Sequence, residues 1–200
     1  MAINFDIGAG STFEHYINYK AGAGTWEMST DDMNVPFNFT KVVFDLNTME
    51  MGWQLWPKGG SPIWQMDTSA EEALPKPDAD WKRGFKVRVF SKALFGDYPV
   101  RLFSCANKGG MDGMKKLWME YDKAKQPGKL PVVAFNGATK INVGEGSTCV
   151  PDLVIDKWID APQELLDAAL GVEEVAVSPS SAAASLPDGA GDSDEEDEFI

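Results

Sequence analysis

The segment WKRGFKVRVFSK, which begins at Trp81, alternates apolar residues with basic and aromatic ones. Successive side chains of a β-strand point to opposite faces, so Phe85, Val87 and Val89 are predicted to face a core. The other face and its flanks carry Lys82, Arg83, Lys86, Arg88, Phe90 and Lys92. Cations contact phosphates, and aromatic rings stack on bases of any sequence. The segment therefore predicts a surface that binds single-stranded nucleic acid, and the alternative is a solvated sheet face.

The next predicted strand, Val100 to Cys105 (VRLFSC), repeats this alternation. We expect Arg101 and Phe103 to extend the basic, aromatic surface, and Lys140, in a later strand, to add to it. The charge distribution agrees with this expectation. Residues 81–129 contain twelve basic residues against four acidic ones, whereas residues 1–80 contain four basic residues against twelve acidic ones. Positive charge concentrated in one part of a chain is typical of a site for a polyanion.

Three tryptophans lie close together in the segment MGWQLWPKGGSPIWQM. The intervening PKGGSP has the composition of a hairpin tip, and Lys58 lies within it. Trp56 and Trp64 bracket this tip, so we expect them to stack on bases when the loop closes over a strand of nucleic acid. Trp53 is in phase with neighbouring apolar residues, and Trp118 lies on the apolar stripe of a predicted helix, so both are expected in the core.

The C-terminal end of the chain is acidic and rich in small residues. No Lys or Arg follows Lys157, and the formal net charge of −13 arises almost entirely beyond it. An Ala/Ser/Pro-rich stretch, 177–187, leads into the sequence DGAGDSDEEDEFI, which offers too little apolar surface to fold. We therefore predict a nucleic-acid-binding domain at 1–171 and a disordered linker and tail at 172–200.

The apolar end of this acidic tail predicts a docking peptide for partner proteins, and a purely solvated tail is the alternative. The residues expected to bind partners are Asp194, Glu195, Glu196, Asp197, Glu198, Phe199 and Ile200. The same negative charge is expected to compete with DNA for the basic surface.

Segments rich in β-branched and aromatic residues, bounded by Gly, Pro or Asn, predict a mainly β fold. The predicted strands are Phe37–Leu46, Met49–Trp56, Phe85–Phe90, Val100–Cys105, Val132–Phe135, Thr139–Val143 and Leu153–Ile159. Apolar residues at helical spacing predict an amphipathic helix around 111–121, and a second short helix is expected at 162–170. Strands with one inserted helix predict an OB-fold-like antiparallel barrel of five strands; a β-sandwich with a covering helix is the alternative.

Residues that could support catalysis or bind a metal are sparse. His15 is the only histidine, and Cys105 and Cys149 lie far apart, so a His-based nucleophile, a disulfide framework and a zinc site are not expected. The Gly-rich segment 144–148 lacks the Lys-Ser/Thr ending of a phosphate loop and is interpreted as a turn. No run approaches the roughly 18 apolar residues of a membrane helix, and the polar start is no signal peptide. We predict a soluble, cytoplasmic protein that is not an enzyme and uses no cofactor.

The chain resembles the single-stranded DNA-binding proteins of bacteria and their phages. The resemblance lies in the two basic strands, the inserted helix, the segment LPVVAFNGATKINVGEGSTCVPDLVIDKWIDAP and the terminus GDSDEEDEFI, and phage-encoded members are the most similar. It covers roughly Trp81 to Pro162 and the tail. It implies an OB fold and a non-catalytic protein that protects single-stranded DNA during phage replication and recombination in the bacterial cytoplasm.

The resemblance also implies that the tail recruits replication or recombination proteins. Bacterial tails of this kind end in Pro-Phe, whereas Ile200 comes last here, so partners encoded by the phage are expected. A single-stranded RNA-binding protein or nucleic-acid chaperone would use the same surface and is the first alternative. An acidic protein that mimics DNA is the second, although a mimic should be acidic throughout, unlike residues 81–129.

Overall fold

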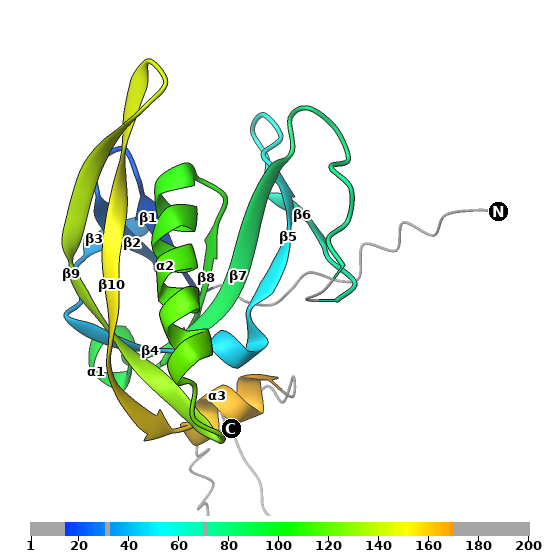
Figure 1. Ribbon diagram of the computed structural model, residues 1–200. Coiled ribbons are helices and arrows are strands. Elements are labelled where there is room, and N and C mark those ends of the chain that lie inside the picture. The colour runs from blue at the N-terminus through cyan, green and yellow to red at the C-terminus, as the bar shows by residue number, and fades with distance from the viewer. Residues whose placement is uncertain (1–14, 31–32, 70–71, 170–200) are drawn as a thin grey trace, which may run out of the picture.

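A computed structural model describes residues 15–30, 33–69 and 72–169 of the chain (Figure 1). This part is mainly β, and its strands join in one mixed sheet. The strands are β1 (Tyr16–Lys20), β2 (Thr25–Ser29), β3 (Asn34–Phe37), β4 (Lys41–Phe44), β5 (Glu50–Leu55), β6 (Ile63–Met66), β7 (Lys82–Phe90), β8 (Val100–Cys105), β9 (Lys129–Val143) and β10 (Gly146–Asp160). The helices are a 3-10 turn η1 (Leu46–Thr48), α1 (Lys92–Phe95), α2 (Lys108–Ala124) and α3 (Gln163–Ala169).

The sheet is open, with the strand order β10-β9-β4-β7-β8-β1-β2-β3. β5 also pairs with β7, and β6 pairs with β5. β1 and β8 run parallel, with Tyr16 opposite Leu102, and the other neighbours are antiparallel. The mainly β prediction is confirmed, but the described strands do not close into a five-stranded barrel.

The N-terminal strands explain why the expected barrel is an open sheet. β1 takes the edge of β8 that would otherwise be available to β10. β10 instead reaches the far end of β1, where the backbone N–H of Cys149 donates to the carbonyl of Ala21 at 2.7 Å. The Tyr19 hydroxyl reinforces this contact by donating to the Cys149 carbonyl at 3.0 Å. β10 and the end of β1 therefore approach each other without forming a ladder of paired strand residues.

The helix α2 lies between β10 and the β7–β8 pair (Figure 1). Asn107 caps its first turn, since the side-chain oxygen accepts from the Gly110 N–H at 2.8 Å. Glycines let the helix approach β10 closely: a Cβ on Gly109 would lie 2.1 Å from the Cys149 carbonyl oxygen, and one on Gly113 would lie 2.5 Å from Cγ of Pro151. The predicted amphipathic helix is confirmed.

Several elements differ from the sequence prediction. β1, β2, β3 and β6 were not predicted, because strands of four or five residues offer only a short pattern and depend on their neighbours in the sheet. β9 unites two predicted strands. The turn predicted at 144–148 is present at Gly144 and Glu145, which connect β9 to β10, but β10 already begins at Gly146. Long-range pairing between β9 and β10 orders both segments.

The core gathers around Trp26, whose ring centroid lies 5.0 Å from that of Phe103 and 5.1 Å from that of Phe39. A second, smaller cluster contains Leu165, which docks α3 against β4 and β9. Trp118 was expected in the core, but it is 36% exposed on α2 and packs against the buried Tyr121. Among the described helices, none is long and apolar enough to cross a membrane.

Candidate nucleic-acid interface

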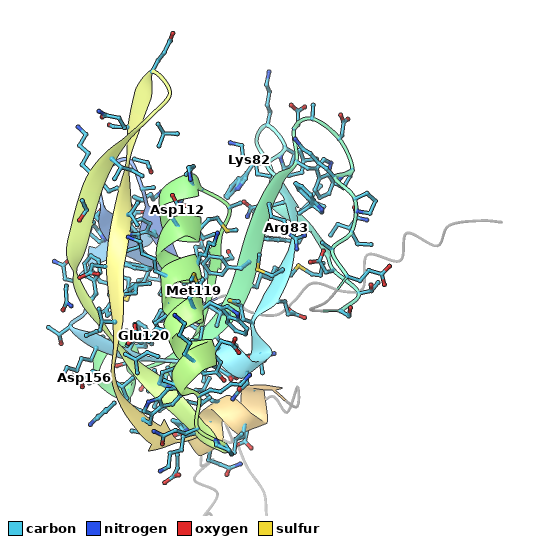
Figure 2. The ribbon with its side chains drawn as sticks, viewed as in Figure 1. Lys82, Arg83, Asp112, Met119, Glu120 and Asp156 are labelled. Carbon is cyan, nitrogen blue, oxygen red and sulfur yellow. The ribbon has the colours of Figure 1, made fainter. Side chains whose placement is uncertain are left out.

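One face of the β5–β6–β7 ribbon carries aromatic, amide and basic side chains in register. Gln54 in β5 lies opposite Trp64 in β6 and opposite Lys82 in β7. The two-residue period of a strand places Trp56 and Lys86 on the same face. Figure 2 shows Lys82 at the end of β7 beside the β5–β6 hairpin. The face therefore combines ring surfaces with positive charge.

This face forms one wall of a groove of about 790 Å³, and β1 and β8 form the other. The lining residues are Tyr16, Asn18, Tyr19, Lys20, Asn34, Gln54, Trp56, Ser61, Pro62, Trp64, Lys82, Lys86, Leu102, Ser104, Cys105, Ala106 and Asn107. Within the described ranges, none of the residues that line it is acidic. A groove with this lining can accept an anionic chain and stack planar groups.

The two groove tryptophans are held differently. Trp56 is 64% exposed, and its indole N–H donates to the side-chain oxygen of Gln54 at 2.9 Å. Trp64 is half-buried, because its ring lies over Gly84, where a Cβ would come within 2.9 Å of the ring. The ammonium of Lys86 lies 5.2 Å from the centroid of the Trp64 ring. Both predicted stacking residues therefore lie in the groove.

The groove cations differ in their surroundings. Burial lowers the pKa of Lys86, and the carboxylate of Glu50 opposes this shift. Lys82 is exposed at the groove wall, and Lys58 is exposed in the turn between β5 and β6. Lys20, on the opposite wall, forms an ion pair with Glu27 at 3.1 Å. An anion that replaced water beside Lys86 would favour its charged form.

Arg83 lies on the opposite side of the ribbon from Lys82, because neighbouring residues in a strand face opposite ways. Its guanidinium donates to both carboxylate oxygens of Asp67, to Oδ1 at 2.8 Å, and lies 5.5 Å from the Trp53 ring centroid. The hydrogen bonds from Arg83 hold the pKa of Asp67 below its usual range. Arg83 therefore binds a structural partner outside the groove.

Four other predicted site residues, at the C-terminal end of β7, in α1 and in the β9–β10 hairpin, also lie outside the groove. Phe90 packs against the small cluster around Leu165, and Lys92 in α1 forms an ion pair with Glu164 in α3. Arg88 is partly buried and does not line the groove. Lys140 is exposed on the β9–β10 hairpin, also outside the groove lining. The structure does not bring these four residues together with the groove tryptophans.

Arg101 and Phe103 were predicted on the exposed basic, aromatic surface, but both side chains are buried. Arg101 is 5% exposed and donates to the Ser29 carbonyl at 2.6 Å, while Phe103 is 1% exposed in the core. Residues opposite each other in an antiparallel pair share a face, and Phe103 lies opposite the buried Val87. The predicted phase of β8 was therefore wrong, and its groove-facing residues are Leu102 and Ser104.

Sequence reasoning also missed the β1 wall. Tyr16, Asn18 and Lys20 line the groove, while Ile17 between them is buried. The alternation in YINYK was a usable signal for such a strand. The predicted partner-binding residues at 194–200 lie outside the described residues. The described part of the chain contains no cluster of three or more His, Cys, Asp or Glu residues that could hold a metal ion.

Comparison with known proteins gives no relative. The chain matches no family model, no curated protein and no solved structure.

Proposed function

We propose that the protein binds single-stranded DNA in the groove between the β5–β6–β7 ribbon and the β1–β8 wall, without strong sequence preference. The observation that carries this proposal is the lining: Trp56 and Trp64 supply ring faces, Lys82 and Lys86 supply positive charge, and no described lining residue is acidic. Rings stack on any base, and lysines neutralise phosphates, so such a groove favours a single strand over a duplex.

The arrangement of strands supports an OB-like domain with an open seam. β4 pairs with β7 and β9, β7 pairs with β8, β9 pairs with β10, and α2 follows β8, which is the strand order and helix position of an OB fold. The resemblance to phage single-stranded DNA-binding proteins gives the biological role, which is protection of exposed strands during replication and recombination. The acidic C-terminal residues serve as the docking segment for partner proteins and compete with DNA for the groove.

Fluorescence titration with poly-dT tests the proposal, using Trp56→Ala and Trp64→Ala. Loss of a stacking ring should cost about 1 to 3 kcal/mol of binding free energy in each variant. Trp118→Ala is the matched control, because Trp118 lies on α2 outside the groove lining. This variant should bind poly-dT with the affinity of the wild type. Unfolding curves check that each variant is folded.

Competition experiments identify the ligand. With a fluorescently labelled single-stranded oligonucleotide bound to the protein, unlabelled poly-dT should displace it at far lower concentration than unlabelled duplex DNA does, because paired bases cannot stack on protein rings. Wild-type affinity in both folded groove variants, or equal binding to duplex DNA, would contradict the proposal. Tighter binding to poly-U than to poly-dT would support an RNA-binding protein instead.

A further inference from the structure

We infer that Gln54 is a positioning residue that fixes the ring of Trp56 in the orientation in which a base stacks on it. The inference rests on the proposed function of the groove. Gln54 is 6% exposed and lies in β5 at the groove wall. It is a buried polar residue beside a largely exposed aromatic ring.

The geometry of the hydrogen bond fixes both partners. The Trp56 Nε1 donates to the Gln54 Oε1 at 2.9 Å. An indole N–H can only donate, so the amide oxygen, and not the amide nitrogen, must face it. Register pairing places Gln54 between Trp64 and Lys82 on neighbouring strands, which restricts where its own side chain can turn. The bond therefore ties an exposed ring to a buried residue in the middle of the ribbon.

The bond is more important for orientation than for stability. Trp56 is 64% exposed, so water could satisfy its N–H and the net contribution to folding is small. The next residue, Pro57, begins the turn between β5 and β6, where its carbonyl accepts from the Gly60 N–H at 3.3 Å. Without Gln54 the Trp56 ring would be free to rotate in the unbound protein, so DNA binding would have to restrict its motion at a cost in conformational entropy. Immobilising one side chain reduces affinity by about 2- to 12-fold.

A double-mutant cycle tests the inference. Gln54→Met keeps the side-chain length and removes the acceptor, and Trp56→Phe keeps an aromatic ring and removes the donor. Gln54→Met should weaken poly-dT binding by about 2- to 12-fold in the wild-type background. In the Trp56→Phe background the same change should alter affinity by less than about 2-fold, since the bond is already absent. Gln65→Met, on the opposite face of β6, is the matched control and should bind like the wild type.

A spectroscopic measurement separates positioning from general packing. The indole N–H signal of Trp56 in ¹⁵N NMR is identified by its loss in Trp56→Phe. Its hydrogen exchange should be faster in Gln54→Met, while the other indole signals keep their rates. Equal weakening of binding in both backgrounds, or an unchanged exchange rate, would overturn the inference. Wild-type DNA affinity in Trp56→Ala and Trp64→Ala would instead show that the proposed function itself fails.

Discussion

At the scale of single residues, Gly84 determines where a groove tryptophan lies. It is buried in the middle of β7, between β5 and β8, and it has no side chain to occupy the space above it. Trp64 fills that space, with the Lys86 ammonium beside its ring. The absence of a side chain at Gly84 therefore leaves room for an aromatic ring and an ammonium group side by side at the groove wall.

Gly84→Ala should damage both folding and binding. The new Cβ would lie 2.6 Å from the Cys105 carbonyl oxygen and 2.9 Å from the Trp64 ring, so β8 or the ring must move. Overpacking of this kind destabilises by about 1 to 3 kcal/mol, and displacement of the ring should also weaken poly-dT binding. Urea unfolding and DNA titration measure the two effects. Gly22→Ala is the control, since its Cβ would meet no atom within 4 Å; equal stability of the two variants would contradict the argument.

At the scale of elements, Asp67 links the segment that follows β6 to the face of the β5–β6–β7 ribbon that lies opposite the groove. Its carboxylate accepts hydrogen bonds from Arg83 and, at 3.1 Å, from the backbone N–H of Leu74. The Leu74 carbonyl in turn accepts from the Trp53 indole at 2.8 Å. These bonds hold β5, β6 and β7 together from the side opposite the groove, so the groove wall depends on them.

The hydrogen bonds from Arg83 lower the pKa of Asp67 in the folded protein, so the charged carboxylate stabilises the fold above the unfolded pKa of about 3.9. That contribution is lost as pH falls through the folded pKa. Asp67→Asn should therefore lower the free energy of unfolding by about 1 to 3 kcal/mol near neutral pH, and the difference from wild type should shrink below pH 4. Urea unfolding at several pH values measures this.

Asp112→Asn is the matched control, because Asp112 pairs with Lys108 on the exposed surface of α2 and such pairs contribute little. A difference between Asp67→Asn and wild type that persists unchanged in acid would show that the lost charge is not the cause.

At the scale of the whole molecule, the groove and the start of the C-terminal segment lie at opposite ends of β7. Lys82 begins the strand at the groove (Figure 2), and Phe90 ends it against the cluster that anchors α3. Nine extended residues separate these points by roughly 27 Å. Residues 170–200 are 31 residues of chain, whose fully extended length of roughly 100 Å exceeds this distance. The acidic end is therefore long enough to reach the groove.

Deletion of residues 178–200 should raise the affinity for poly-dT several-fold, because seven acidic residues would no longer compete for the groove lysines. The gain should be largest at low salt, where charge interactions are least screened. The deletion leaves α3 and Leu165 in place, so the unfolding transition should not change. DNA titration across a salt series measures the effect, and weaker binding by the truncated protein would contradict the proposed competition.

The sequence determined the features that depend on local pattern. Alternation predicted the buried set Phe85, Val87 and Val89, and helical spacing predicted α2. These predictions succeeded because strand and helix periods arise from backbone geometry within one segment.

Only the tertiary structure decided which patterns share a surface. Each face of the strand VRLFSC carries apolar residues, Val100 and Leu102 on one and Phe103 and Cys105 on the other, so its own sequence does not say which face is buried. Pairing with β7 decided this, and it buried Arg101 and Phe103. Pairing of β1 with β8 added β1 to the groove wall and left the sheet open, and pairing of β5 with β6 and β7 brought Arg83 to Asp67. A one-residue change of phase moves every side chain of a strand to the other face. That phase is set by neighbouring strands far away in the chain, which a local pattern does not contain.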